Sequence, residues 1–337
     1  MIYRTFLITL LSILTHIPAE SQYNKVLVKE IFVEYDQDGY PMPSSLKKAI
    51  IEQYFDESDE DKISVQQVFG GYYTERMYVV KLQKERNEIP VFYLKISRNA
   101  HSTQRLIDIK EGWIYQDMAR EIESDNLAII VWIENVFTYT DPKGTIKTIE
   151  VTYAVSESSL KEILYSENER VIEDSAYAVG KAVAAFHLLF MDYKNNDLDA
   201  RSWVTVCHGD FNIKNIHFSS TTKKVYLIDN EDMNKGCIEQ DLKQILMNFT
   251  ILQYLRYNYP ARWPLYITHC SSFLRGYVES YPEEKRGPVA ALILSILTAR
   301  VEAFVHEKIY TPLDMTGNEF NEEQFAAIIY KYLNNIF

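Results

Sequence analysis

The most informative part of this chain reads Val206-Cys207-His208-Gly209-Asp210-Phe211-Asn212-Ile213-Lys214-Asn215-Ile216, and Val225-Tyr226-Leu227-Ile228-Asp229 follows shortly after it. An apolar strand end leads into a polar loop that carries His208, Asp210 and Asn215, and a second apolar strand leads to Asp229. Phosphoryl transfer requires one carboxylate that takes the proton of an attacking hydroxyl, and an amide oxygen and a second carboxylate that hold Mg²⁺. The pattern therefore favours phosphoryl transfer, and a turn rich in Asp and Asn between two buried strands is the alternative.

The order of these residues resembles the kinase-like phosphotransferases, and within them the group of aminoglycoside phosphotransferases, choline kinases and thiamine kinases. That group typically carries His-Gly-Asp, an Asn five residues beyond the Asp, and then Ile-Asp-x-Glu, which here is Ile228-Asp229-Asn230-Glu231. Protein kinases tend to have Arg at the position of Gly209 and Phe-Gly after the metal-binding Asp. The resemblance favours the small-molecule branch. Asn230 replaces the aromatic residue that is usual in choline and thiamine kinases, so neither subfamily is assigned.

The resemblance also implies a role for each residue of the motif. Asp210 is expected to be the catalytic base, with His208 and Asn215 as the other catalytic residues of the loop. Magnesium is expected to be bound by Asn215, Asp229 and Glu231. The expected cofactors are thus ATP and Mg²⁺, and the expected acceptor is the hydroxyl group of a small molecule. His208 taken alone is more typical of a buried structural histidine.

A second group of motifs precedes this loop and resembles the nucleotide-binding elements of the same family. The segment Val68–Leu82 reads as strand, tight turn and strand around Gly70-Gly71, and glycines let the backbone approach a ligand closely. The resemblance implies that this turn and Thr74 lie over the ATP phosphates, whereas taken alone it reads as an ordinary hairpin turn. It is not a Walker loop, because no Gly-Lys-Ser/Thr follows.

Lys95 stands inside the apolar strand pattern of residues 90–97 and shares a face with Tyr93 and Ser97. The resemblance implies that it contacts the α and β phosphates and needs a carboxylate from a following helix. Residues 102–122 have helical spacing, with Glu111 on an apolar side, and a carboxylate there is costly unless a cation meets it. We therefore expect Lys95 to pair with Glu111, and a solvent-facing lysine is the alternative.

Three further segments agree with the resemblance to kinase-like phosphotransferases. Residues 149–155 look like a strand that runs into a connector, followed by a Ser-capped helix from Ser158, where the family joins its lobes and binds adenine. Residues 179–187 resemble the family helix beneath the catalytic loop, with His187 as a structural residue. Asp241 is expected either to brace the catalytic loop, as in the family, or to be a plain helix-start aspartate. Loop signals occur at residues 141–144 and 286–288.

The resemblance implies an α+β, bilobal, protein-kinase-like fold with a small antiparallel-sheet N-lobe and a mostly helical C-lobe, and the length of the chain fits two lobes. The 337 residues are 47% hydrophobic, which is ample for two cores. The expected division is a signal-like segment of residues 1–21, a nucleotide-binding lobe of residues 22–155, and a catalytic and substrate lobe of residues 156–337. Residues 247–337 are helical by pattern.

A formal net charge of −12 argues against nucleic acid or an anionic membrane as the main partner. It would suit a cationic small-molecule substrate, although surface acidity also serves solubility. The aromatic residues between Tyr254 and Tyr266 could contribute to a cage for an ammonium group, but core packing is favoured for them. No membrane partner is expected beyond an N-terminal anchor.

The N-terminus resembles a signal peptide. Arg4 precedes the apolar run Phe6–Leu14, and Ala19-Glu20-Ser21 offers small residues for cleavage before Gln22. The run is too short for a comfortable membrane span. Because ATP is scarce outside the cytoplasm, three interpretations stay open: export into a compartment supplied with ATP, an uncleaved anchor, or an over-extended start of a cytoplasmic chain.

The three cysteines, Cys207, Cys237 and Cys270, form no metal-site spacing, and Cys207 is expected to be a small buried residue rather than a nucleophile. A protein kinase is the alternative function, but little room for an activation segment lies between Asp229 and Asp241, and no Ala-Pro-Glu follows. A nucleotide-binding pseudokinase with a regulatory role is a third class. The complete set of polar groups weighs against it.

Overall fold

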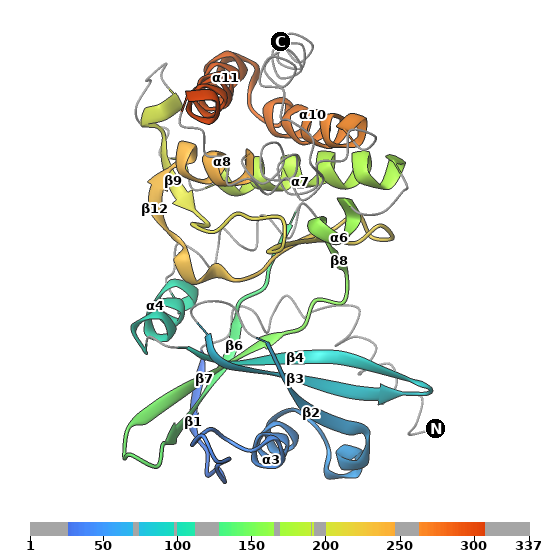
Figure 1. The fold of residues 1–337 in the computed structure, drawn as a ribbon, viewed down its shortest axis with the longest axis vertical. Coiled ribbons are helices and arrows are strands. Elements are labelled where there is room, and N and C mark those ends of the chain that lie inside the picture. Colours follow the sequence, from blue (N-terminus) through green and yellow to red (C-terminus); the bar gives the residue numbers. More distant parts are fainter. Residues whose placement is uncertain are drawn as a thin grey trace. The chain divides into compact units, whose positions relative to one another are not determined.

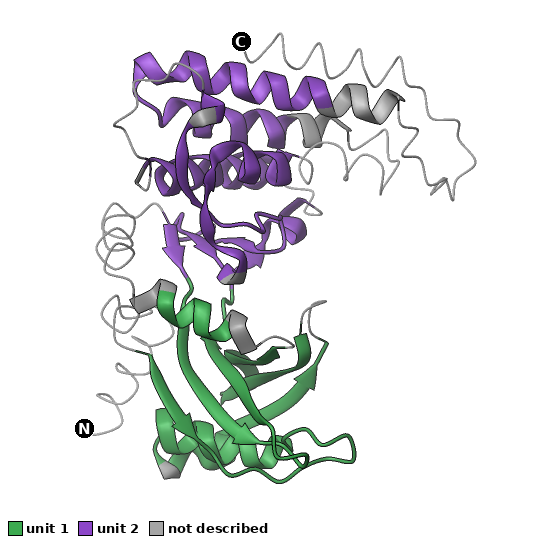
Figure 2. Ribbon diagram, turned by 90° about the vertical axis from the view of Figure 1, so that its left-hand side faces the viewer, with its two compact units in different colours: residues 1–120, 131–156 green, residues 121–130, 157–337 purple. Residues whose placement is uncertain are grey.

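The computed structural model describes residues 26–69, 74–97, 100–111, 128–164, 169–189, 191, 200–246 and 263–306. The chain divides into two compact units, residues 1–120 with 131–156 and residues 121–130 with 157–337 (Figure 2). The main boundary therefore lies one residue beyond the predicted one. The predicted division did not include the return of residues 121–130 to the second unit, where β5 (Ala128–Ile130) pairs in parallel with a later strand, β11.

The first unit is a six-stranded sheet of order β1-β6-β7-β4-β3-β2 with helices on both faces (Figure 1). All neighbouring strands are antiparallel except β1 and β6, which pair in parallel, so the predicted antiparallel sheet has one parallel edge. Its elements are β1 (Leu27–Glu30), α3 (Pro43–Tyr54), η1 (Glu57–Lys62), β2 (Ile63–Val68), β3 (Thr74–Lys84), β4 (Asn87–Ser97), α4 (Ala100–Glu111), β6 (Ile133–Thr140) and β7 (Ile146–Tyr153).

Strand alternation gives this sheet one apolar and one polar face. Phe92, Leu94 and Ile96 of β4 are buried in the main core together with Leu46 and Ile50 of α3. The intervening residues of β4 point to the opposite face, where α4 packs. There Leu106 and Ile107 of α4 form a smaller cluster with Val26, Ile133 and Val136. The polar face of β4 is therefore covered in part by α4, on the side of the sheet away from α3 (Figure 1).

The second unit is mostly helical and carries two small sheets, of order β5-β11-β10-β8 and β12-β9. Helix α6 begins with a capping box, in which Ser159 and Glu162 exchange hydrogen bonds, as the Ser-capped helix predicted. Its further elements are β8 (Ser158–Ser159), α6 (Leu160–Leu164), α7 (Glu169–Leu189), η2 (Ala200–Ser202), β9 (Val204–Cys207), β10 (Ile216–Phe218), β11 (Val225–Leu227), η3 (Asn230–Asp232), β12 (Asn234–Cys237), α8 (Ile238–Leu246), α10 (Trp263–Glu279) and α11 (Glu283–His306).

Helices α7 and α10 pack through two reciprocal glycines. A Cβ on Gly180 of α7 would lie 2.1 Å from the Phe273 carbonyl oxygen, and one on Gly276 of α10 would lie 2.3 Å from the Tyr177 carbonyl oxygen. Each glycine thus lets the partner backbone approach to contact distance. Helix α7 also contacts β9, since the Thr205 hydroxyl of β9 donates to the His187 carbonyl oxygen of α7 at 2.7 Å. β9 is the strand that leads into residues 208–215.

The predicted α+β fold class is confirmed, with a sheet-rich unit followed by a mostly helical one. The loop signal at residues 141–144 is confirmed as a turn, but the signal at residues 286–288 is wrong, because these residues lie inside α11. Pro288 comes early in the helix, and the Arg286 side chain donates to the carbonyl oxygens of Glu279 and Tyr281 at the end of α10. These bonds fix the turn between the two helices just ahead of α11.

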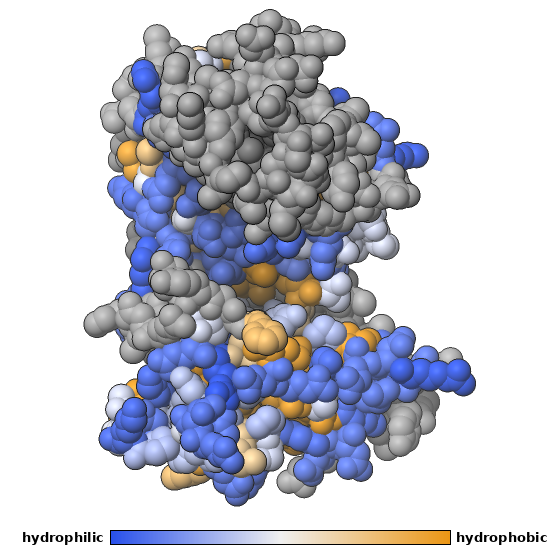
Figure 3. All heavy atoms as spheres, in the orientation of Figure 1, coloured by the Kyte–Doolittle hydropathy of each residue, from blue (hydrophilic) through white to orange (hydrophobic). Residues whose placement is uncertain are grey.

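Among the described residues, no helix has the length and apolar character that crossing a membrane would require. Hydrophilic side chains cover most of the described surface on the face shown in Figure 3. The signal-like segment of residues 1–21 and the Tyr-rich stretch from Tyr254 to Tyr259 lie outside the described residues.

Candidate active site

The loop of residues 208–215 connects two strands that are fixed independently. β9 precedes it and pairs with β12, in the register Cys207 with Asn234. β10 follows it and forms an antiparallel hairpin with β11, in the register Ile216 with Leu227. The bond from the Ile228 N–H to the Asn215 carbonyl oxygen, 3.0 Å, extends this hairpin by one pair. Asn215 and the residues leading to Asp229 therefore lie at the same end of the hairpin.

Helix α8 clamps the backbone of the loop with two side chains on one of its faces. Asp241 is fully buried and accepts the N–H groups of His208, at 2.7 Å, and Gly209, at 3.0 Å. Gln244, three residues on, accepts the Phe211 N–H at 2.9 Å and donates to the Gly209 carbonyl oxygen at 2.5 Å. The bracing role expected for Asp241 is confirmed. Gln244 was not foreseen.

The His208 ring is buried and completes this set of backbone contacts. Its Nδ1 accepts the Asp210 N–H at 3.3 Å, so the proton of the neutral ring lies on Nε2, which donates to the Ile228 carbonyl oxygen at 3.0 Å. Burial lowers the pKa of His208, against the opposing effect of Asp241, so the ring is neutral at pH 7. The neutral ring joins the loop to the residue just before Asp229.

Position 209 can be occupied only by glycine. Its φ is +83°, and a Cβ there would lie 2.2 Å from the Asp232 carbonyl oxygen. Both the left-handed backbone and the contact with residue 232 exclude a side chain. The arginine that protein kinases tend to carry at this position could not be accommodated without moving the segment after Asp229.

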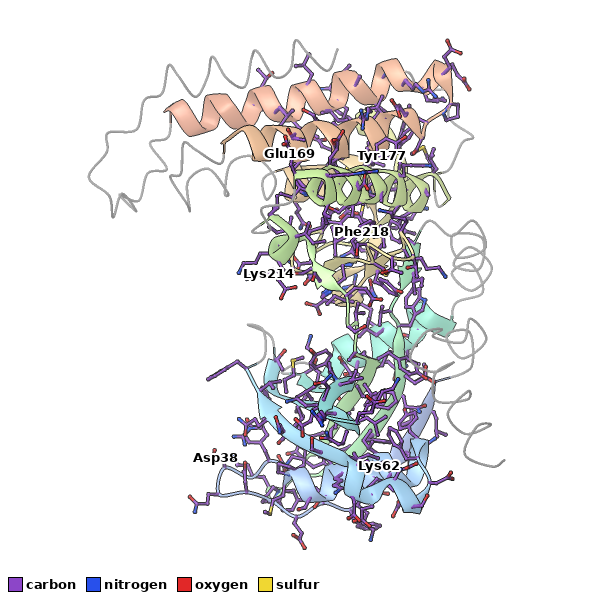
Figure 4. All side chains as sticks on the ribbon, turned by 90° about the vertical axis from the view of Figure 1, so that its right-hand side faces the viewer. Asp38, Lys62, Glu169, Tyr177, Lys214 and Phe218 are labelled. Carbon is purple, nitrogen blue, oxygen red and sulfur yellow. The ribbon has the colours of Figure 1, made fainter. Side chains whose placement is uncertain are left out.

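Two amide side chains hold the Asp210 carboxylate. Asn215 donates from Nδ2 to Asp210 Oδ2 at 2.8 Å, and Asn212 donates to the same oxygen at 3.0 Å. Among the described residues no hydrogen bond reaches Asp210 Oδ1, so this oxygen is available to an incoming hydroxyl. Asn212 was not predicted as a site residue, because its role depends on a local loop geometry that a single Asn does not signal. Asn212 also accepts the backbone N–H of Lys214, whose exposed side chain lies at the edge of this unit in Figure 4.

The expected metal ligands have oxygen atoms of the type that Mg²⁺ prefers. Asn215 directs its amide N–H groups to Asp210, which leaves its Oδ1 for a cation. Asp229 has an exposed side chain and a left-handed backbone, φ +60°, a conformation that Asp tolerates better than most residues. The Glu231 side chain lies outside the described ones. Among the described side chains, no three His, Cys, Asp or Glu residues are grouped as a metal site, so the donor set rests on Asn215 and Asp229.

A buried hydrogen-bonded chain lies behind Asp241. His187 Nε2 lies 3.1 Å from Asp241 Oδ2, and His187 Nδ1 lies 2.8 Å from the Tyr277 hydroxyl. The Tyr277 hydroxyl in turn lies 2.8 Å from that of Tyr281, and burial raises the pKa of Tyr277 well above its usual value. The prediction that His187 is structural is confirmed, since this chain ties α7 and α10 to the residue that holds the catalytic loop.

Cys207, directly before the loop, is buried, and its Sγ donates to the Cys237 carbonyl oxygen at 3.2 Å. Burial raises the pKa of this thiol, which keeps it protonated. The prediction that Cys207 is a small buried residue rather than a nucleophile is confirmed.

The predicted nucleotide-binding residues belong to the first unit. Thr74 begins β3 and is buried, and the two predicted strands are confirmed as β2 and β3, which pair in antiparallel. Gly70 and Gly71 lie outside the described residues. Lys95 is half-buried on the polar face of β4. The helix predicted from residue 102 is confirmed as α4 up to Glu111, whose side chain lies outside the described ones, so its pairing with Lys95 stays a prediction.

Comparisons with known proteins found similar solved structures of low sequence identity. No family model matches it, and no curated protein matches it. Among solved structures, it is similar to an ethanolamine kinase of Plasmodium vivax, with 11% identity and a TM-score of 0.45 over 89% of this chain and 92% of that one. It is also similar to WaaP in complex with acyl carrier protein, with 14% identity and a TM-score of 0.41 over 78% of this chain and 98% of that one.

Proposed function

We propose that the protein is an ATP- and magnesium-dependent phosphotransferase that acts on the hydroxyl group of a small molecule. The observation that carries this proposal is the geometry of Asp210. Its Oδ2 is held by Asn212 and Asn215, its Oδ1 has no hydrogen-bond partner among the described residues, and α8 fixes the backbone of its loop. A carboxylate fixed in this way is suited to orient a hydroxyl and accept its proton.

The residues around Asp210 supply positioning and electrostatic stabilisation, which dominate catalysis of phosphoryl transfer. Asp210 Oδ1 would accept the proton of the acceptor hydroxyl as the hydroxyl oxygen bonds to the γ-phosphorus of ATP. The bond between that phosphorus and the bridging oxygen of the β-phosphate would break, and ADP would leave. Asn215 Oδ1 and Asp229 would hold magnesium, with Glu231 as a further ligand. Magnesium, when bound there, would neutralise charge on the phosphates. His208, with both ring nitrogens engaged in the loop, would position Asp210 rather than transfer a proton.

In the first unit, Lys95 would contact the α and β phosphates, and the turn of Gly70 and Gly71 with Thr74 would lie over them. A lysine on a strand offers a compact cation to the phosphates without the planar geometry of arginine. A cationic acceptor such as an amino alcohol would suit the net charge of −12. Gly209, where protein kinases carry arginine, favours the small-molecule branch over a protein kinase.

Calorimetry of nucleotide binding tests the proposal at the metal site. The wild type should bind ATP with Mg²⁺ and lose most of that affinity when EDTA is added. Asp229→Ala should bind MgATP at least about ten-fold more weakly, which corresponds to a loss of about 1.4 kcal/mol of binding free energy. Asp232→Ala is the matched control, because Asp232 is an exposed aspartate three residues away. Equal MgATP affinity in the wild type and Asp229→Ala would remove the metal role from Asp229.

A further inference from the structure

A second carboxylate, Glu150 of β7, lies on the polar face of the first unit directly beside Lys95. The antiparallel register of β4 and β7 sets Lys95 opposite Glu150. Directly opposed residues point to the same face, with Cβ atoms roughly 4.5–5.5 Å apart. The two side chains are therefore cross-strand neighbours on the face that α4 covers.

Glu150 is far more buried than a strand glutamate normally is. Only 2% of its surface is exposed. Its Oε1 accepts a hydrogen bond from the Thr103 hydroxyl of α4 at 2.7 Å, and one from the Ser97 hydroxyl of β4 at 3.3 Å. Thr103 also lies 3.1 Å from the Thr148 hydroxyl of β7. Three elements, α4, β4 and β7, thus meet at this one carboxylate.

A buried carboxylate is costly unless hydrogen bonds and a cation offset its loss of hydration. The hydroxyls of Thr103 and Ser97 supply the hydrogen bonds, and Lys95 is the cationic residue opposite Glu150 in the strand register. Glu88 shows the ordinary alternative on the same strand as Lys95. It is exposed and lies 3.5 Å from Lys81 as a surface ion pair.

We propose that Glu150 is a positioning residue for Lys95, a role that rests on the proposed function. Its carboxylate, fixed to α4 through Thr103 and to β4 through Ser97, directs the Lys95 ammonium towards the phosphates. The position of α4 is thereby linked to Lys95 through β7, in addition to any pairing with Glu111. A change in the seating of α4 would move Glu150 and alter the contact of Lys95 with the nucleotide.

The test compares affinities for MgATP and for adenosine in the full chain, because Lys95 acts only on the phosphates. Glu150→Gln should weaken MgATP binding about ten-fold, equivalent to about 1.4 kcal/mol, and leave adenosine affinity unchanged. Glu88→Gln is the matched control and should change neither. Combining Glu150→Gln with Lys95→Met should add little to the loss that Lys95→Met causes alone, because the two residues act as a unit.

The possible results separate this proposal from the proposed function. If the wild type bound no nucleotide, both would fall. If the wild type bound MgATP and Glu150→Gln bound it equally well, or lost MgATP and adenosine affinity in the same proportion, only the positioning role would be overturned. Should Glu150→Gln not fold, Thr103→Val keeps the carboxylate and removes one hydroxyl donor. It should weaken MgATP binding by a smaller factor and spare adenosine, and an unchanged MgATP affinity would overturn the role.

Discussion

Asp241→Asn replaces the carboxylate that holds the backbone of the loop of residues 208–215. The fully buried Asp241 carboxylate accepts the N–H groups of His208 and Gly209 at 2.7 and 3.0 Å and lies 3.1 Å from His187. An asparagine keeps one acceptor oxygen and presents an NH₂ group in place of the other. At least one backbone N–H then faces a donor and loses its partner.

The size of the effect follows from the strength of the lost bond. A hydrogen bond to a charged group contributes about 1.5–3 kcal/mol, and Asp241→Asn should destabilise the loop by about that amount. Each 1.4 kcal/mol is a factor of ten in an equilibrium constant, so the amides of His208 and Gly209 should exchange with deuterium about 10- to 150-fold faster. Because the same loop carries Asp210, the turnover number should fall more than the affinity for MgATP.

Hydrogen–deuterium exchange of the segment around residues 204–218 provides the assay. Glu239→Gln is the matched control on the same helix. Glu239 forms a partly exposed ion pair with Lys243 at 2.6 Å, one helical turn away, and such a pair contributes only about 0.5 kcal/mol or less. Exchange in Asp241→Asn that matched the Glu239→Gln control would refute the clamping role of Asp241.

Three further predictions concern other parts of the chain. Gly209→Ala should destabilise the protein by about 2–5 kcal/mol in urea unfolding, through left-handed strain and overpacking against residue 232. Gly144→Ala, also at positive φ but with no atom within 4 Å of its Cβ, should cost only about 1–2 kcal/mol, and equal losses would show that the steric contact does not matter. Burial lowers the pKa of His269 to about 3, below its unfolded value of about 6.5, so the unfolded state alone gains a proton as the pH falls. The free energy of unfolding should therefore fall by up to about 1.4 kcal/mol per pH unit below about pH 6.5. His269→Gln should make this pH dependence shallower, and an unchanged pH dependence would assign it to other titratable groups. A chain that starts at Gln22 should fold cooperatively and bind ATP, and a large loss of thermal stability would mean that residues 1–21 pack into the first unit.

The features that the sequence predicted correctly are those in which neighbouring residues carry the signal. His208, Gly209, Asp210 and Asn215 lie within one short loop, and the structure confirms the two predicted strands that flank it. The catalytic and metal-binding roles of these residues stay predictions. The capping box of Ser159 and Glu162 was predictable for the same reason, since both partners lie within one helical turn.

The features that the sequence did not predict depend on contacts between distant segments. Gln244 is unremarkable on an amphipathic helix, and only the approach of α8 to residues 208–211 gives it a role. Glu150 shares one face of β7 with Thr148 and Thr152, a polar pattern typical of a strand face that points to solvent. It is buried because α4 packs over that face. At residues 286–288 the loop prediction from Gly-Pro was wrong for a local reason. Pro288 comes early in α11, and the Arg286 side chain bonds only five and seven residues back along the chain, to Tyr281 and Glu279.

The proposal that Asp210 is the base of a hydroxyl-directed phosphotransferase is best tested by acceptor-dependent turnover, measured in the wild type and in Asp210→Asn. ATP consumption should be measured with amino alcohols, aminoglycosides, sugars and thiamine as acceptors, with Asp232→Asn as the control for an exposed aspartate. If Asp210 is the catalytic base, the wild type and the control should form ADP in an acceptor-dependent manner. Asp210→Asn should then turn over about 10²- to 10⁴-fold more slowly with an unchanged affinity for MgATP. Turnover of Asp210→Asn within a few-fold of the wild type, or no acceptor-dependent turnover by the wild type, would contradict it.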